Sequence, residues 1–197
     1  MQQKLSKREE THKRMLAAAG RSFRSHGYAG IGVDGIAKEA GVTSGAFYAH
    51  FGSKDGAFSL AVRDGLDEVI AGVPVFQSNH GEDWVQAFAE YYLGKPHRED
   101  QACGCAMTSL TPEVGRSNDE LKLTYEKKMS KIASLIAEGL AGTSEENRIA
   151  RAWAMLAVLI GGLNITRAIN NLDTAEQISE AVKSAAIKAA GQTQITV

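Results

Sequence analysis

The chain has 197 residues, of which 44% are hydrophobic and 23% are charged, a balance typical of a globular protein. It contains no run of about 18 apolar residues, and its first fifteen residues are polar, so we expect neither a membrane span nor a signal peptide. The two cysteines, in "CGC", are too close for an ordinary structural disulfide, which favours a reducing, cytoplasmic location.

The net charge of −1 is unevenly distributed. Residues 1–63 contain ten Lys/Arg and five Asp/Glu, a balance of +5, whereas residues 64–197 contain 12 and 18, a balance of −6. This asymmetry suggests that only the first third of the chain meets a polyanion, although chance clustering is the simpler alternative. The basic run in that third is either solvated or in contact with phosphate: Lys4, Lys7, Arg8, Lys13 and Arg14.

Three helices are predicted in the first third. The first covers 8–26 and ends at Gly27, because apolar residues recur on one face and glycine is a common C-terminal cap. The second lies in "VDGIAKEAG" and ends at Gly41, and the third is "SGAFYAHF", capped by Thr43 or Ser44. Phe47 and Phe51 stand four residues apart, so we expect both on the buried face of the third helix.

The remaining two thirds also favour helices. Ser53 is expected to cap a helix that reaches about residue 72, followed by a loop in "GVPVFQSNHGED" and a helix in "DWVQAFAEYYLG". A second loop, "GKPHREDQACG", precedes a short helix over 103–113 that ends near Pro112. Three longer helices follow, beginning in "SNDE", at Ser144 and at residue 174. With no convincing strand pattern, the prediction is an all-α chain of about nine helices.

A helix-turn-helix unit is indicated between residues 33 and 51. Ala37 is small where the two helices would cross, and Gly41 allows the left-handed turn between them. Residues 44–46 are small, so the start of the third helix could approach a base edge closely. Tyr48 and His50 could donate to phosphate oxygens, and Lys54 adds a positive charge near the next helix N-terminus.

The segment "GYAGIGVDGIAKEAGVTSGAFYAHFGSKDGAF", residues 27–58, resembles the tetracycline-repressor (TetR) family of bacterial transcription regulators. The matching parts are Val33, Ile36–Ala37, Ala40–Gly41–Val42, Gly45, Tyr48, His50–Phe51 and Ser53–Lys54–Asp55. The chain departs from the family pattern at Ile31 and Gly32, where the family often has hydroxyl residues that cap the second helix and touch phosphate, so we expect this cap and one phosphate contact to be lost. It departs again at Gly35, Ser44 and Ala46, where an acidic residue, Lys and Thr are common. These departures shorten the side chains available for base contacts, so readout would depend on Thr43, Ser44, backbone approach and Ala46 against a thymine methyl group.

The resemblance implies a three-helix DNA-binding domain over 1–52 and a larger helical domain for effector binding and dimerisation over 53–197. It also implies a homodimer that binds a near-palindromic double-stranded operator, with no cofactor. The predicted DNA-binding residues are Gly32, Val33, Thr43, Ser44, Gly45, Ala46, Tyr48, His50 and Lys54.

Dimerisation has independent support in residues 149–165, "IARAWAMLAVLIGGLNI", which are apolar on nearly all sides. A single small domain cannot bury every face of such a helix, so a partner surface is expected. The predicted interface residues lie in the last two long helices: Trp153, Leu156, Ile160, Leu163, Arg167, Ile178 and Val182.

An effector pocket is expected among residues 58–140. Its candidate lining residues are aromatic or flexible side chains, although each could equally be plain core: Trp84, Phe88, Tyr92, Met107 and Tyr125. Cys105 and Cys103 lie near a predicted helix start, where amide dipoles favour the thiolate. Many members of the family resemble this chain in a Gly-Cys pair at this place, and some of these respond to electrophiles or oxidants, whereas packing is the alternative role for Cys105.

Other chemistries have little support in the sequence. His97, Cys103 and Cys105 could supply three zinc ligands, but no convincing metal cluster is present and we expect no metal. No Ser/His/Asp or paired-carboxylate arrangement suggests catalysis. The sequence therefore favours a DNA-binding regulator, most simply a repressor released by a small molecule, an electrophile or an oxidant. The alternatives are a cysteine-based redox enzyme using Cys103 and Cys105, and a helical ligand carrier.

Overall fold

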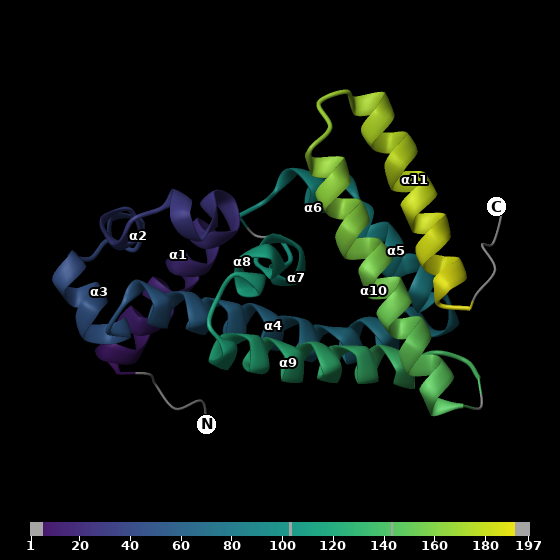
Figure 1. Cartoon of the computed structure of the whole chain (residues 1–197), viewed down its shortest axis with the longest axis horizontal. Helices are drawn as coiled ribbons and strands as arrows, with labels where there is room; N and C mark the ends of the chain where they lie inside the picture. The colour runs from purple at the N-terminus through teal and green to yellow at the C-terminus, as the bar shows by residue number, and fades with distance from the viewer. Residues whose placement is uncertain (1–5, 103, 143, 192–197) are drawn as a thin grey trace. The chain divides into compact units, whose positions relative to one another are not determined.

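The computed structural model describes residues 6–102, 104–142 and 144–191. Over these residues the chain is entirely helical, with one 3₁₀ turn and no strand (Figure 1). The helices are α1 (Lys7–Gly30), α2 (Val33–Glu39), α3 (Ser44–Phe51), α4 (Lys54–His80), η1 (Gly81–Asp83), α5 (Trp84–Leu93), α6 (Lys95–Glu99), α7 (Ala106–Ser109), α8 (Thr111–Gly115), α9 (Asp119–Glu138), α10 (Glu145–Arg167) and α11 (Leu172–Ala189). The predicted all-α class is confirmed. The described residues form eleven helices instead of about nine, because α6 lies in a segment expected as a loop and α7 and α8 replace the single helix expected over 103–113.

The chain divides into two compact units. The first comprises the residues up to 65 together with 101–122, and the second comprises 66–100 together with the residues from 123 onward. Helices α4 and α9 contribute residues to both units. Because these units reflect backbone packing and not function, the expected functional boundary after residue 52 stays a prediction.

The core of the first unit joins α1, α2 and α3 to the start of α4. Met15, Phe23, Ile36 and Phe47 are fully buried there, each with 0% exposure. Gly27 interrupts α1 with a φ of 71°, so the predicted break at this glycine is confirmed although residues 28–30 return to helical geometry. Burial of these large apolar side chains fixes the orientation of the two short helices on α1.

The second unit is built around α5, α10 and α11, and the last two helices lie side by side (Figure 1). Gly162 of α10 permits this contact, because a Cβ atom there would lie 2.3 Å from Cγ1 of Val182 on α11. Leu156, Leu159 and Leu163 of α10 are buried within the unit. Close approach of helices at a small residue follows the ridge-into-groove packing of α-helices.

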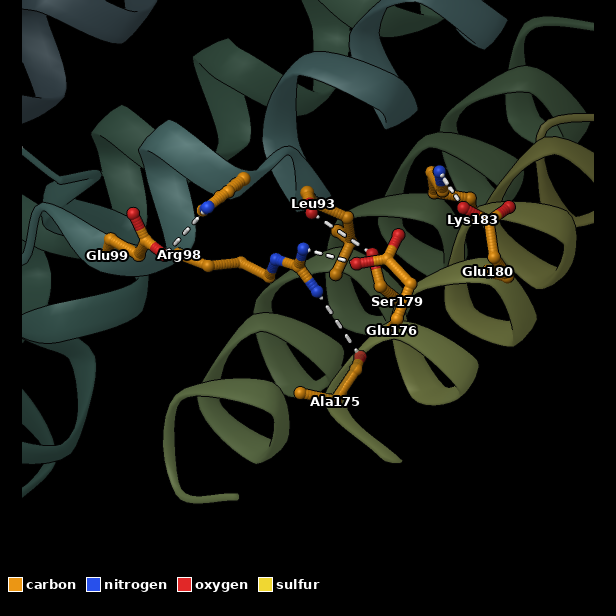
Figure 2. Close-up of polar contacts among 9 residues, drawn as sticks. Leu93, Arg98, Glu99, Ala175, Glu176, Ser179, Glu180 and Lys183 are labelled. Atoms are coloured by element: carbon orange, nitrogen blue, oxygen red, sulfur yellow. Dashed lines mark hydrogen bonds and ion pairs between the residues drawn. The ribbon is translucent and has the colours of Figure 1, made fainter. Parts of the chain in front are cut away.

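Polar contacts attach α5 and α6 to α11 (Figure 2). The guanidinium of Arg98 donates to the Glu176 carboxylate at 2.5 Å and to the Ala175 carbonyl at 3.4 Å. The buried Ser179 hydroxyl donates to the Leu93 carbonyl at 3.0 Å. These contacts stabilise helix α6 in a segment that was expected to be a loop.

The predicted loop over 73–83 is wrong, because α4 continues through Pro74 to His80. Proline removes one helical hydrogen bond, a local cost that tertiary packing offsets here. Val73 is 3% exposed, and the Gln77 amide donates to the Leu135 carbonyl of α9 at 2.9 Å. Pro112 likewise lies at the second position of α8, where proline is tolerated, instead of ending a helix.

Helix α10 is long and apolar enough to cross a membrane by length and composition. This is weak evidence, since core helices of globular proteins pass the same test. In this chain α10 packs against α5, α6 and α11, and 39% of its most apolar stretch is buried.

Candidate nucleic-acid interface

The turn between α2 and α3 has the geometry expected of a helix-turn-helix unit. Gly41 adopts a φ of 64°, which side-chain-bearing residues rarely reach. The Val42 amide donates to the Ala37 carbonyl at 2.9 Å, and the Gly41 amide donates to the Lys38 carbonyl at 3.1 Å. These bonds close the C-terminus of α2 and set the direction in which α3 begins.

Helix α3 begins and ends at the predicted residues. The Thr43 hydroxyl accepts a hydrogen bond from the Ala46 amide at 3.2 Å, which confirms Thr43 as the N-cap. Phe47 and Phe51 are buried and their rings meet edge to face with centroids 4.9 Å apart, as the spacing predicts. Both phenylalanines thus lie in the core, and the opposite face of α3 remains accessible.

The accessible face carries most of the predicted DNA-contact residues. Tyr48 is 51% exposed, and Thr43 and Gly45 are exposed, while Ala46 is half-buried. Gly45 has no side-chain neighbour except the Thr43 hydroxyl, 3.8 Å from where its Cβ would lie. Nothing bulky therefore covers the first turn of α3, which leaves its backbone open to close approach by a ligand.

Ser44 is engaged in a contact that the sequence does not reveal. Its hydroxyl donates to the Asp34 carboxylate of α2 at 2.5 Å. The donor hydrogen of Ser44 is thereby directed to Asp34, so the pair presents only acceptor oxygens and one negative charge. The two residues are ten apart in sequence, and their contact depends on the crossing of α2 and α3, which periodicity alone does not determine.

The departures at positions 31 and 35 are structurally linked. A Cβ atom at Gly35 would lie 2.6 Å from Cδ1 of Ile31, so isoleucine fills the space that a side chain at 35 would need. Gly32 is the N-cap of α2 in extended geometry and makes no side-chain capping bond, and Val33 follows as the first helical residue. The expected loss of a hydroxyl cap at the start of α2 is confirmed.

Lys54 is held at the first position of α4 by an aromatic ring. Its ammonium lies 4.4 Å from the centroid of the Tyr28 ring. The Tyr28 hydroxyl donates to the Asp55 carboxylate at 2.5 Å, and this bond raises the pKa of Tyr28 to about 12. Tyr28 thus connects two neighbouring charged residues at the start of α4, a role that the sequence analysis missed.

The basic residues of α1 divide into two groups. Arg14 donates to the Ala40 carbonyl at 3.0 Å, and Arg21 pairs with Glu39 at 2.9 Å, so both attach α1 to α2. Lys7, Arg8 and Lys13 are exposed, whereas Lys4 lies outside the described residues. The run of positive charge is therefore partly structural, which its sequence pattern did not distinguish.

A histidine pair connects α1 to α3. Nδ1 of His12 lies 3.3 Å from Nδ1 of His50, and the His12 ring also contacts Phe51. Burial, then the neighbouring His12 and Arg8, lower the pKa of His50. His50 thus lies beside a second histidine that was not among the predicted site residues.

The first-unit geometry agrees with comparisons to known proteins. The family model described as "Bacterial regulatory proteins, tetR family" matches residues 15–59, which run from within α1 to the start of α4. The transcriptional regulatory protein RaaS of Mycobacterium tuberculosis is 28% identical over 77% of this chain and 68% of its own length. The match places residues 15–59, which contain the helix-turn-helix unit, in the TetR family. With this region and transcriptional regulators as its relatives, the chain is a DNA-binding transcriptional regulator and not an enzyme.

Two solved structures show that the likeness extends over the whole fold. The reduced form of Escherichia coli NemR has a TM-score of 0.73 at 19% identity, covering 89% of this chain and 96% of NemR. A TetR-family regulator from Cytophaga hutchinsonii has a TM-score of 0.77 at 17% identity, covering 98% and 100%. By sequence, the repressor NemR of E. coli K12 is 24% identical over 70% of this chain and 71% of its own length.

The candidate effector residues lie mainly in the core of this protein. Trp84, Phe88 and Tyr92 are buried along one face of α5, and the indole of Trp84 donates to the Gly139 carbonyl at 2.9 Å. Met107 is buried in the first unit, and Tyr125 is half-buried in the second. Their role in effector binding stays a prediction, since the alternative core role also fits their burial.

Cys105 is half-buried and forms the N-cap of α7, as its predicted position at a helix start requires. That helix has only four residues, so its dipole is much smaller than that of a long helix. Cys103 lies outside the described residues. Among the residues that the structure describes, no group of three or more His, Cys, Asp or Glu side chains could hold a metal ion.

Two of the predicted dimer residues require correction. Leu156 and Leu163 are 1% and 0% exposed within the single chain, so they pack in its own core and cannot meet a partner directly. The periodicity could not separate them, because α10 is apolar on several faces. Exposed or half-buried positions remain available to a partner: Trp153, Ile160, Arg167, Ile178 and Val182.

Proposed function

We propose that this protein is a repressor that binds a near-palindromic DNA operator as a homodimer and releases it when an effector is bound. The observation that carries the proposal is the accessible first turn of α3. The turn at Gly41 precedes this helix, and Phe47 and Phe51 hold its opposite face in the core. In this proposal α3 enters the major groove, as recognition helices of such units do.

The side chains on α3 suggest a division of contacts. Thr43, Gly45 and Ala46 would approach the base edges, whereas Tyr48, His50 and Lys54 would bind backbone phosphates. Tyr48 is exposed and Lys54 is fixed against the Tyr28 ring, which supports both as phosphate ligands. The Ser44–Asp34 pair offers only acceptors, which suits a base-edge amino group such as that of cytosine.

Exposed apolar side chains support dimerisation through α10 and the start of α11. Trp153, Ile165 and Leu172 are 39%, 54% and 78% exposed. Burying them against a second copy would remove this apolar surface from water. Two-fold symmetry would then present two α3 helices to a near-palindromic site.

Release would follow from an effector that favours a protein conformation with lower affinity for DNA. A small molecule bound in the second unit is one such effector. Modification of Cys105 by an electrophile or oxidant is another, and the existence of a defined reduced form of NemR is consistent with redox chemistry in a related fold. The proposed location is the cytoplasm, where an operator is accessible.

A DNA-binding titration tests the proposal. Full-length protein is added to DNA from the flanks of its own gene, and binding is followed by gel shift at several salt concentrations. We expect a specific, salt-sensitive complex that is weakened by Tyr48→Ala and by Lys54→Ala. A complex of equal affinity with unrelated DNA, or wild-type binding by both variants, would contradict the proposed interface. Addition of a quinone, with Cys105→Ser as the control, separates the thiol route from reversible ligand binding.

A further inference from the structure

A solvent-open cavity lies between the start of α1 and the end of α3. Its volume is about 420 Å³, and it is lined by Arg8, Glu9, His12, Lys13 and His50. All five residues belong to the first unit, and two of them form the histidine pair described above. Because His50 lies in the last turn of the helix that carries the proposed base contacts, a ligand in this cavity would lie beside the DNA-binding face.

The charges around the cavity favour an anion. Arg8 and Lys13 contribute two positive charges, whereas Glu9 contributes the single negative one. The Glu9 carboxylate already accepts hydrogen bonds from the amide and hydroxyl of Ser6, both at 2.8 Å, and these bonds lower the pKa of Glu9. Glu9 thus caps α1 and also interacts electrostatically with Lys13, and the cavity keeps a net positive charge because Arg8 and Lys13 outnumber Glu9.

The histidine contact restricts protonation in the free protein. At 3.3 Å between the two Nδ1 atoms, one nitrogen donates and the other must accept with its lone pair. The accepting nitrogen cannot take up a proton while this contact lasts, and burial with Arg8 nearby also lowers the pKa of His50. An anionic oxygen placed between the rings would accept from both Nδ1 atoms and would favour the protonated pair.

We propose that this cavity binds one backbone phosphate of the operator and that the His12–His50 pair takes up a proton when the phosphate enters. Arg8 and Lys13 supply fixed positive charge, and the histidines supply donors whose charge depends on pH. The inference rests on the proposed DNA binding. It adds a contact from α1 to those from α3 and α4, and it makes operator affinity depend on pH through linkage.

Fluorescence anisotropy with a specific operator fragment tests the proton uptake. Affinity is measured from pH 6.0 to 8.5 at constant ionic strength, in the presence of EDTA, for the wild type and for His12→Gln, His50→Gln and His26→Gln. His26 is the matched control, because it lies on the same helix but its ring nitrogen contacts the Ser22 carbonyl instead. If binding takes up one proton, the affinity of the wild type for the operator falls by up to about tenfold for each unit by which the pH rises.

We expect His12→Gln and His50→Gln to reduce this pH dependence and His26→Gln to retain it. An unchanged slope in His12→Gln would overturn the pair as the proton-binding site. Circular dichroism and thermal unfolding establish that each variant is folded, and Asn replaces Gln if a Gln variant is not. If the wild type forms no specific complex at any pH, the proposed DNA-binding function fails. If it forms one, and its affinity depends on pH as that of His12→Gln and His50→Gln does, only the proton uptake by the His12–His50 pair fails.

A second comparison tests the fixed charge. Arg8→Gln removes a cation that lines the cavity, whereas Lys7→Gln removes the neighbouring exposed cation that does not line it. Loss of one phosphate contact should lower affinity and reduce the slope of log K against log salt by about one. We expect Arg8→Gln to show this reduction and Lys7→Gln to show less. Equal slopes in the two variants would overturn the phosphate contact from this cavity.

Discussion

Gly162 and Val182 meet so closely that no other residue type fits at position 162 without movement. A Cβ atom there would lie 2.3 and 2.7 Å from the two methyl groups of Val182 and 2.9 Å from its Cβ. Since valine has one strongly preferred rotamer in a helix, its side chain cannot rotate away cheaply. The spacing of α10 and α11 is therefore set at this glycine.

Gly162→Ala should destabilise the protein by roughly 1–3 kcal/mol, because overpacking forces the two helices apart. Urea unfolding of the full chain measures the effect. Gly161→Ala is the matched control, since nothing lies within 4 Å of its Cβ position and alanine is the better helix former. Equal stability of the two variants would show that the contact is more adaptable than its distances indicate.

The acceptor pair of Ser44 and Asp34 should restrain binding to DNA of unrelated sequence. Asp34→Asn removes a negative charge beside the proposed DNA-binding face, so affinity for a random duplex should rise several-fold, on the order of 1 kcal/mol. Asp64→Asn is the control for the change in net charge. Anisotropy on random and operator duplexes measures both. A decrease in random-duplex affinity with Asp34→Asn would contradict a repulsive role.

The Tyr28 ring should position Lys54 for DNA binding. Tyr28→Leu removes the cation–π contact and should weaken operator binding by roughly two- to fivefold, the equivalent of about 0.5–1 kcal/mol. Tyr28→Phe keeps the ring and loses only the bond to Asp55, so it should bind nearly as the wild type does. Equal losses in the two variants would assign the effect to the hydroxyl. In the wild type, the raised pKa of about 12 places phenolate formation by Tyr28 well above that of free tyrosine in an absorbance titration.

His97 should make the second unit sensitive to acid. Burial, then the nearby Arg167, lower its pKa from 6.5 to about 4, so the folded protein keeps the ring neutral where the unfolded chain binds a proton. The stability that this contributes is present above pH 6.5 and is lost as the pH falls toward 4. The melting temperature of the wild type should therefore fall across this window.

His97→Gln should show a smaller fall in melting temperature between pH 6.5 and 4, whereas His80→Gln should behave as the wild type does. His80 is the control because it lies exposed at the end of α4 in the same unit. Parallel melting curves for all three proteins would indicate that other groups cause the acid sensitivity.

Local signals predicted the helix-turn-helix unit well. Gly41, the Thr43 cap and the Phe47–Phe51 pair are each explained by short-range geometry, and α3 has the predicted bounds. The continuation of α4 through Pro74 could not be predicted, because the packing that offsets the lost hydrogen bond comes from a helix far along the chain. The burial of Leu156 and Leu163 and the Ser44–Asp34 bond have the same origin, since each depends on how helices cross.

The Ile31 side chain, which occupies the space where a Cβ atom at position 35 would lie, also affects how this surface can change in evolution. The common TetR-family pattern has a hydroxyl residue at 31 and an acidic residue at 35, and this chain has neither. An acidic side chain at 35 would meet the end of the Ile31 side chain, which would have to move aside. The two positions are therefore coupled, and the coupling is weak because the atom that blocks position 35 is the flexible end of Ile31.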